Sequence, residues 1–202
     1  MSSTNRSDAR DTHISDYYVT PQLCIQDFFS AWLKDMKDVE DFLSVGHQID
    51  QMVFLDPCAG GDEQHPMSYT DFIKRELGAK NVHSIDIRES SLADIKTNFL
   101  LWEATNEYDV VITNPPFNLA QEIITKSLEV VQDGGYVIML LRLNFFGSKA
   151  RKAFWDKQMP IRAYVHHRRM SFTDDGKTDS IEYMHCVWQK GNFPKETLLR
   201  LI

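Results

Sequence analysis

The chain has 202 residues, of which 43% are hydrophobic and 25% are charged, and its net charge is −7. This length suits one domain with a core of its own, and the composition is that of an ordinary globular protein. No apolar run approaches the ~20 residues that a membrane-spanning helix needs. The acidic balance argues against a protein that coats nucleic acid non-specifically.

The first residues, MSSTNRSDARDTHISD, are polar and lack the apolar core of a signal peptide. We expect residues 1–15 to be a flexible arm and residues 16–202 to form a single domain. The tandem His166-His167 has no cysteine or carboxylate cluster beside it, so we predict no metal site. The three cysteines are scattered and fit neither a disulfide framework nor a zinc pattern, which predicts a reducing, cytoplasmic location; they are Cys24, Cys58 and Cys186.

Apolar periodicity predicts an alternation of helices and strands. In chain order we expect a helix at 22–36, a strand at 52–56, a helix at 68–78, strands at 81–86 and 110–113, a helix at 119–135, a strand at 136–142, a helix at 147–158, and strands at 161–167 and 183–190. We expect Ser68 to cap its helix and Gly134-Gly135 to close the helix before them. The stretch 87–107 fits either one helix or a helical turn with a short strand at 98–101.

This alternation predicts an α/β fold, Rossmann-like, with a mostly parallel sheet and helices on both faces. The last two strands flank the polar residues 173–180 and should add an antiparallel hairpin at one edge. Ligands of such sheets bind at the carboxyl ends of the strands. Three candidate motifs end predicted strands: LDPCAGGD (55–62), SIDIRE (84–89) and ITNPPF (112–117).

Acidic residues surround the glycine turn that follows the first strand. Gly60-Gly61 allows a tight turn and a close approach to a ligand, but the next residues, Asp62 and Glu63, would repel phosphate. An ammonium or a sulfonium fits better, and S-adenosylmethionine carries both. Asp86 ends the next strand, where a carboxylate can accept from two ribose hydroxyls; helix capping and a plain turn remain the simpler alternatives for these residues.

The NPPF tetrapeptide explains why a buried strand ends in two prolines. Pro115 and Pro116 stop the strand and stiffen the chain. The side-chain carbonyl of Asn114 and the backbone carbonyl of Pro115 can then both point outward, and two acceptors match an exocyclic amine with two N–H groups. Phe117 offers a face for stacking a base. The alternative is an ordinary turn with Phe117 in the core.

These motifs carry a resemblance. NPPF resembles the signature of amino-methyltransferases, and LDPCAGGD is similar to the glycine motif of class I S-adenosylmethionine-dependent methyltransferases. YYVTPQL (17–23) resembles the motif upstream of it, and RRMSFTDDGKTDSIEYMHCVW (168–188) resembles a late aromatic motif of adenine-N6 DNA methyltransferases. The chain is most similar to the small phage-type N-6-adenine DNA methyltransferases, from about residue 15 onward.

The resemblance implies S-adenosylmethionine as cofactor, a class I methyltransferase fold and a set of site residues. Catalytic roles fall to Asn114, Pro115, Pro116 and Phe117. Thr20 would contact the methionine carboxylate, Asp86 the ribose and Asn98 the adenine of the cofactor. Cofactor binding would involve Tyr18, Thr20, Asp56, Pro57, Cys58, Gly60, Asp86, Ile87, Asn98, Phe99 and Asn114. Asp62 stands where the pattern has a third glycine, and Asn98 where Asp is frequent.

The implied reaction is methylation of adenine N6 in DNA. The target base would lie against Phe117 and Phe172, and the phosphates against the basic residues Lys149, Arg151, Arg168 and Arg169. Adenine in RNA, cytosine N4, a glutamine amide in a protein, and a catalytically silent binder remain alternatives. No insertion is large enough for a target-recognition domain, so specificity is low or comes from the basic segment 142–169 and the loop 173–180.

Overall fold

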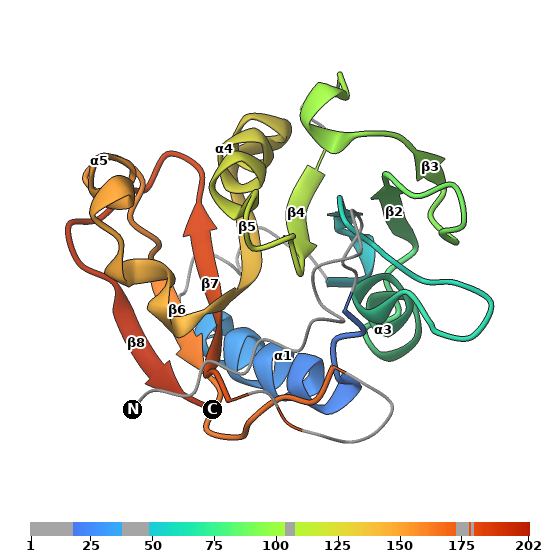
Figure 1. Ribbon diagram of the computed structural model, residues 1–202, viewed down its shortest axis with the longest axis horizontal. Coiled ribbons are helices and arrows are strands. Elements are labelled where there is room, and N and C mark those ends of the chain that lie inside the picture. Colours follow the sequence, from blue (N-terminus) through green and yellow to red (C-terminus); the bar gives the residue numbers. More distant parts are fainter. Residues whose placement is uncertain (1–17, 38–48, 104–107, 173–177, 179) are drawn as a thin grey trace, which may run out of the picture.

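The computed structural model describes residues 18–37, 49–103, 108–172, 178 and 180–202. The predicted arm, residues 1–15, lies outside this part of the chain, and so does most of the loop 173–180. The described residues build one eight-stranded sheet with helices packed against it (Figure 1).

The helices are α1 (Gln22–Lys37), α3 (Ser68–Glu76), α4 (Ala120–Val130) and α5 (Lys152–Trp155), with 3-10 turns η2 (Ile49–Gln51), η3 (Phe99–Leu101), η4 (Leu143–Gly147) and η5 (Lys149–Arg151). The strands are β1 (Val53–Asp56), β2 (Asn81–Asp86), β3 (Ile95–Lys96), β4 (Tyr108–Thr113), β5 (Val131–Arg142), β6 (Arg162–Val165), β7 (Tyr183–Gln189) and β8 (Leu198–Leu201). Their order across the sheet is β3-β2-β1-β4-β5-β7-β6-β8.

The sheet is mostly parallel, as predicted. Strands β1 to β5 pair in parallel, and β7 is antiparallel to both β5 and β6. The chain proceeds outward from β1 to β2 and β3, then crosses back to β4 on the other side of β1. Parallel sheets bind ligands where the strand order reverses in this way, so the topology marks the carboxyl ends of β1 and β4.

Both faces of the sheet are buried, which explains why its central strands read as continuous apolar runs. Neighbours in β1 point to opposite sides: Phe54 joins the cluster that contains α1 and α3, and Leu55 joins the cluster that contains α4. In β4, Val110 and Val111 divide in the same way. These two clusters hold the sheet between its helices (Figure 1).

Several element boundaries differ from the sequence predictions. Helix α4 ends at Val130, and not at the paired glycines, because Val131 already pairs with Tyr108 of β4. At Gly135 a side chain would meet the Asp109 carbonyl oxygen at 2.8 Å, so that glycine serves close strand packing. Ser68 is the first residue of α3 and does not cap it; its hydroxyl accepts from the Thr20 N–H at 2.9 Å.

The C-terminal third differs most. The predicted helix at 147–158 is reduced to η5 and the four-residue α5. Trp155 of α5 packs against aromatic rings that precede it in the chain; Phe146 and Trp155 have ring centroids 4.7 Å apart. The predicted antiparallel pair is present as β6 and β7. Strand β8, which was not among the predicted strands, pairs with β6 and forms the sheet edge. Phe99–Leu101 form η3 with Asn98 as its N-cap, and the short strand β3 precedes them.

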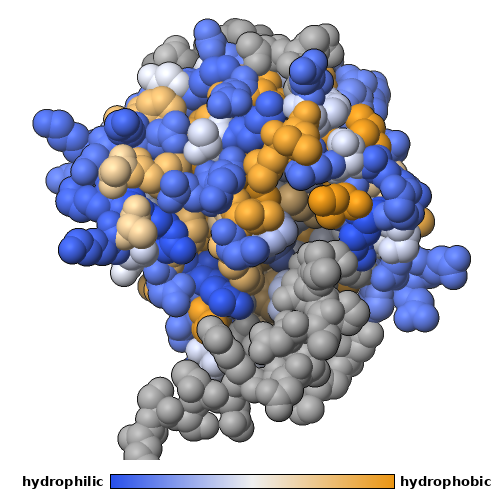
Figure 2. Space-filling model, turned by 45° about the horizontal axis from the view of Figure 1, so that its top comes forward, coloured by the Kyte–Doolittle hydropathy of each residue, from blue (hydrophilic) through white to orange (hydrophobic). Residues whose placement is uncertain are grey.

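Among the described residues, no helix combines the length and the apolar character needed to cross a membrane. Figure 2 shows hydrophobic residues in small groups among many hydrophilic ones on the face that it draws. Two exposed apolar side chains, Ile87 and Leu119, belong to the wall of the pocket described below.

Candidate functional site

A pocket lies at the carboxyl ends of β1, β2 and β4, beside the reversal in strand order. The segment before α1 contributes Tyr18 and Thr20 to its wall, and the start of α3 contributes Ser68 and Tyr69. Most of the predicted cofactor-binding residues line it: Tyr18, Thr20, Pro57, Cys58, Asp86, Ile87, Asn98, Phe99 and Asn114. The fold therefore gathers residues from six separate regions of the chain into one cavity.

Asp56 occupies a different place from the one predicted. It is 1% exposed and does not line the pocket. Its carboxylate accepts from the Thr113 hydroxyl at 2.7 Å, and from the Thr70 hydroxyl and the Cys58 N–H at 3.4 Å. Burial is the main cause that raises the pKa of Asp56 to about 7. Asp56 thus joins the ends of β1 and β4 behind the pocket wall.

The glycine turn makes its close contacts with residues of the loop that follows it, up to Met67. Gly60 and Gly61 have positive φ angles of 67° and 74°, and a side chain at Gly61 would meet Met67 Cγ at 2.6 Å. Asp62 Oδ1 accepts from the N–H groups of Gln64 and His65. The carboxylate that replaces the expected third glycine therefore caps a tight turn and does not face the ligand.

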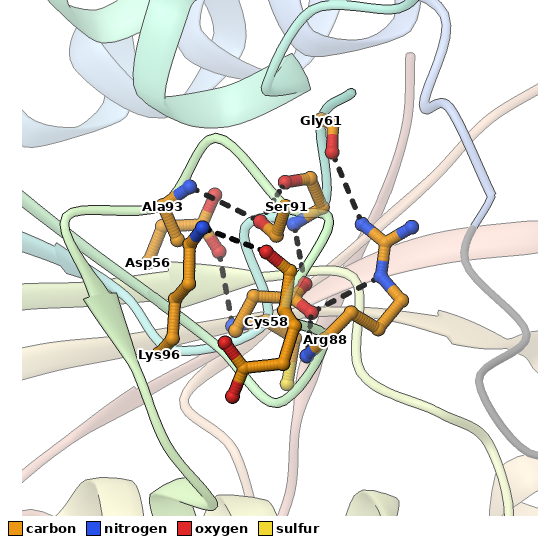
Figure 3. Close-up of polar contacts among 10 residues, drawn as sticks. Asp56, Cys58, Gly61, Arg88, Ser91, Ala93 and Lys96 are labelled. Atoms are coloured by element: carbon orange, nitrogen blue, oxygen red, sulfur yellow. Dashed lines mark hydrogen bonds and ion pairs between the residues drawn. The ribbon is translucent and has the colours of Figure 1, made fainter. Parts of the chain in front are cut away.

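Asp86 organises the wall beside the glycine turn, and the surrounding hydrogen-bond network is drawn in Figure 3. Its Oδ2 accepts from the Gly60 N–H at 2.8 Å, and its Oδ1 accepts from the backbone N–H and Nε of Arg88 at 2.8 Å and 3.1 Å. Arg88 Nη2 also donates to the Gly61 carbonyl at 3.3 Å. Asp86 thus fixes the glycine loop. Gly60 was predicted to bind the cofactor, but it does not line the pocket, and its N–H group donates to Asp86.

Asn98 and Phe99 form the far end of the pocket. Asn98 Oδ1 accepts from the Leu100 N–H at 3.0 Å and so caps η3. The amide oxygen that the sequence assigned to a cofactor amine is therefore partly used by the protein. Phe99 is 4% exposed and presents an apolar surface beside Leu119 and Ile123.

The tetrapeptide at the end of β4 borders the same pocket. Asn114 and Pro116 line it, whereas Pro115 is buried. Asn114 Nδ2 donates to the Thr20 hydroxyl oxygen at 3.2 Å, so Oδ1 is the atom turned away from that bond. Pro116 accepts from the Leu119 N–H at 2.9 Å, which bends the chain into α4. This arrangement presents an amide oxygen at the pocket on a stiff support.

The half-buried Phe117 lies in an aromatic cluster next to the pocket. Tyr18 is 6.5 Å from Phe117 and 5.6 Å from Phe172, centroid to centroid, and Tyr183 contacts the same two rings. The guanidinium carbon of Arg142 lies 4.3 Å from the centroid of the Phe117 ring. A base that enters between Phe117 and Phe172 would therefore have to displace Tyr18.

The predicted basic segment contains both paired and exposed side chains. Arg162 pairs with Asp35 at 3.2 Å, and the partly buried Arg151 lies over the Phe145 ring and donates to its carbonyl. Lys149 is exposed in η5, on the connection that leads to β6, while Arg168 and Arg169 are exposed after the end of β6. Lys149 and the Arg168-Arg169 pair therefore lie on separate segments.

Sequence reasoning missed several residues that the structure places at the site. Arg88 follows Asp86 by two positions, and that spacing was the available signal. Tyr69 lines the pocket and contacts His185, but 116 residues separate the two, so no local pattern could pair them. The tandem histidines have different partners, His185 for His166 and the Ile202 carbonyl for His167.

Comparison with known proteins gave structural neighbours alone. No protein-family model matches the sequence, and no curated protein matches it. A Listeria monocytogenes protein described as a class I S-adenosylmethionine-dependent methyltransferase matches with a TM-score of 0.53 and 16% identity, over 76% of this chain and 59% of that one. The chain thus spans less than two thirds of that protein.

Two further structures match over similar shares of the chain. A Pyrococcus horikoshii protein described as an RNA methyltransferase has a TM-score of 0.53 at 16% identity, covering 70% of this chain and 76% of its own. A Streptococcus thermophilus protein described as a hemolysin has a TM-score of 0.50 at 16% identity, with shares of 80% and 66%. Together with the strand order and the pocket at its reversal, these likenesses show that the chain has the class I methyltransferase fold.

Proposed function

We propose that the chain transfers the methyl group of S-adenosylmethionine to an exocyclic amine, and that this amine is N6 of adenine in DNA. The observation that carries the proposal is the position of Asn114. Its side chain borders the pocket that Asp86 and Asn98 also line, and the next residues lead directly to the aromatic cluster of Phe117. A cofactor pocket and a surface for a planar base thus meet at one amide.

The pocket suits S-adenosylmethionine in its chemistry. When bound, the cofactor supplies a methyl group on a positively charged sulfur. Phe99, Leu119 and Ile123 offer an apolar surface to its adenine. Asp86 also lines the pocket and supplies the carboxylate that would accept from the ribose hydroxyls. Oδ1 of Asp86 already accepts twice from Arg88, so a bidentate contact with two ribose hydroxyls requires the Arg88 side chain to move.

Asn114 can raise the reactivity of an amine. The lone pair of an adenine amine is delocalised into the ring, which makes it a poor nucleophile. If Asn114 Oδ1 and the Pro115 carbonyl each accept one amine proton, the nitrogen becomes more pyramidal and its lone pair can form the N–C bond as the C–S bond breaks. The methylated amine then releases one proton to water. Because these hydrogen bonds strengthen as the nitrogen reacts, they favour the transition state over the bound substrate.

DNA as the substrate is supported by aromatic and basic side chains near the tetrapeptide. Phe117, Phe172 and Tyr183 share one cluster, and stacking on such rings contributes ~1–3 kcal/mol per base. Arg168 and Arg169 are exposed three residues or so before Phe172 in sequence. A base taken from a duplex must first be flipped out, which costs a few kcal/mol, so a single strand is the easier substrate.

RNA is the second candidate, and the fold likeness to a protein described as an RNA methyltransferase favours it. The same amide could also serve a protein glutamine. All of these substrates carry a planar NH₂ group, so the chemistry at Asn114 does not separate them. The difference must come from what binds outside the pocket.

The deciding experiment offers labelled S-adenosylmethionine with DNA, RNA and protein, followed by nucleoside and amino-acid analysis. N6-methyladenine from DNA is the expected product. Methyladenine from RNA alone or methylglutamine would overturn the substrate, and cofactor binding without transfer to any of them would indicate a silent binder.

A further inference from the structure

A chain of buried polar groups leads away from Asn114 into the core. Asn114 donates to Thr20 at 3.2 Å, and Thr20 and Tyr69 lie together in the wall of the pocket, with the Thr20 hydroxyl close to the Tyr69 phenol. Tyr69 Oη is 2.7 Å from His185 Nε2, and His185 Nδ1 is 2.8 Å from His166 Nε2. Every member after Asn114 is at most 4% exposed, so water cannot readily replace these bonds.

The two histidines restrict which groups donate and which accept in this series of hydrogen bonds. Burial lowers the pKa of His166 to about 4 and the pKa of His185 well below its ordinary value, so both rings are neutral near pH 7. A neutral imidazole has one donor and one acceptor. If His185 Nδ1–H donates to His166, its Nε2 must accept from Tyr69, and Tyr69 in turn accepts from Thr20. The hydrogens then all point from the pocket toward the core.

The opposite tautomer of His185 would exchange donor and acceptor in each of these hydrogen bonds. Nε2–H would donate to Tyr69, Tyr69 would donate to Thr20, and the Thr20 hydroxyl would be left to donate to Asn114. That bond needs the amide oxygen of Asn114 on the Thr20 side and places its NH₂ group toward the pocket. Such an amide cannot accept a proton from a target amine. Because a Thr20 hydroxyl that accepts from Tyr69 has its own hydrogen free for the Asn114 oxygen, the tautomer of His185 biases which atom of Asn114 faces the substrate.

We propose that Tyr69, His185 and His166 are positioning residues, which keep Thr20 as an acceptor for Asn114 Nδ2 and so turn Asn114 Oδ1 toward the target amine. This role rests on the proposed amine methylation but holds for any amine substrate. A purely structural role for the three residues predicts a loss of stability alone. A positioning role predicts a loss of turnover in protein that is still folded and still binds cofactor.

The first test is Tyr69→Phe, which removes one hydroxyl from a ring that is 2% exposed. We expect kcat to fall roughly 10- to 100-fold, as for other misplaced reactive groups, with little change in the KM for the amine substrate or in cofactor affinity. The matched control is Tyr164→Phe. Tyr164 is 0% exposed and its hydroxyl donates to Asp35 at 2.9 Å, in the same core cluster but away from the pocket. The control should lose stability and retain kcat.

The second test separates the two ring nitrogens of His185. His185→Gln places an acceptor near Nε2, toward Tyr69, whereas His185→Asn places one near Nδ1, toward His166. Both variants lose the ring that stacks on Phe28 at 4.3 Å, so their melting temperatures should fall together. We expect His185→Gln to retain more activity. Equal activities for the two variants, or an unchanged kcat for Tyr69→Phe, would overturn the proposal.

The orientation of the amide can also be measured without turnover. In ¹⁵N-labelled protein, the side-chain NH₂ signal of Asn114 is assigned by its loss in Asn114→Asp. One of its protons should exchange slowly in the wild type and faster in Tyr69→Phe. Equal exchange in both proteins contradicts the positioning role. Altered exchange in a protein that methylates no amine would retain that role and refute the proposed function.

Discussion

The Thr113 hydroxyl donates to the Asp56 carboxylate at 2.7 Å, joining the carboxyl ends of β4 and β1 where the strand order reverses. The bond is buried, and it fixes the residue immediately before Asn114. The support for the candidate catalytic amide is therefore a contact between two strand ends that are 57 residues apart in sequence. The predictions below test the groups on either side of this junction.

Cofactor affinity should depend on Asp86 and not on Asp62. Asp86→Asn removes a charge that holds both the glycine loop and Arg88, and loss of such charge-assisted bonds should weaken S-adenosylmethionine binding by ~1–3 kcal/mol. Asp62→Asn is the control, because that carboxylate is used within its own turn. Calorimetry measures both affinities; tight binding of NAD in place of S-adenosylmethionine would refute the cofactor assignment.

Asn114→Ala should abolish methyl transfer while the fold and cofactor affinity change little. The interaction it removes strengthens in the transition state, so kcat falls more than substrate binding. Asn114→Asp should keep part of the activity, since a carboxylate still accepts from an amine. Asn118→Ala, at an exposed position four residues on, is the control. Normal turnover by Asn114→Ala would disprove the mechanism.

Phe117 should act through its ring. Phe117→Ala is expected to raise KM and lower kcat, whereas Phe117→Tyr and Phe117→Trp should be tolerated because each keeps a stacking face. A core role predicts a different result, a loss of ~3–5 kcal/mol in unfolding free energy for the alanine variant. Activity and melting temperature measured on the same variants decide between the two, with Phe193→Ala, at a 40% exposed site, as control.

Reversing Arg168 and Arg169 to Glu should weaken DNA binding for all sequences and leave cofactor binding unchanged. Each phosphate contact that is lost should reduce the log–log salt slope by about 0.9 on duplex or 0.7 on a single strand. Lys74 and Arg75 form another exposed basic pair, on α3, and their double reversal controls for net charge. Equal losses in both double variants would exclude a specific site at Arg168-Arg169.

Asp56 and His166 should oppose one another in the pH dependence of stability. Asp56, with its pKa raised from 3.8 to about 7, binds more protons when folded, so its contribution falls as pH rises through that window. His166, with its pKa lowered from 6.5 to about 4, binds fewer when folded, so its contribution is lost as pH falls through its own window. The two effects overlap and partly cancel in the wild type.

Asp56→Asn removes the contribution of Asp56 to the pH dependence and leaves that of His166. Between these pKa values its free energy of unfolding should rise with pH more steeply than that of the wild type, by up to about 1.4 kcal/mol per pH unit. Urea unfolding at several pH values within the window measures the slope. His166→Asn should change the slope in the opposite direction, and parallel profiles for all three proteins would contradict both assignments.

Local sequence patterns were enough to predict the α/β class, most of the strands and the edge of the sheet at which the pocket lies. Continuous apolar runs such as residues 110–113 require burial on both faces, and Pro115 and Pro116 end a strand wherever they stand. Asn114 and Asp86 were found in the same way, because each belongs to a local pattern at the end of a strand, whereas Thr20 was implied by the family resemblance of residues 17–23. Such patterns are readable since their physical cause is local backbone chemistry.

The partners of these residues became visible in the folded structure alone. Asp56 looks like a ligand in sequence, yet Thr113 and Thr70 bind its carboxylate, since burial requires a partner for it. Among the basic residues after Arg142, Arg162 pairs with Asp35 and Arg151 lies over the ring of Phe145. Tyr69 and His185 meet across 116 residues, and β8 exists because β6 offers it an edge. Contacts between distant segments depend on packing, which no local pattern encodes.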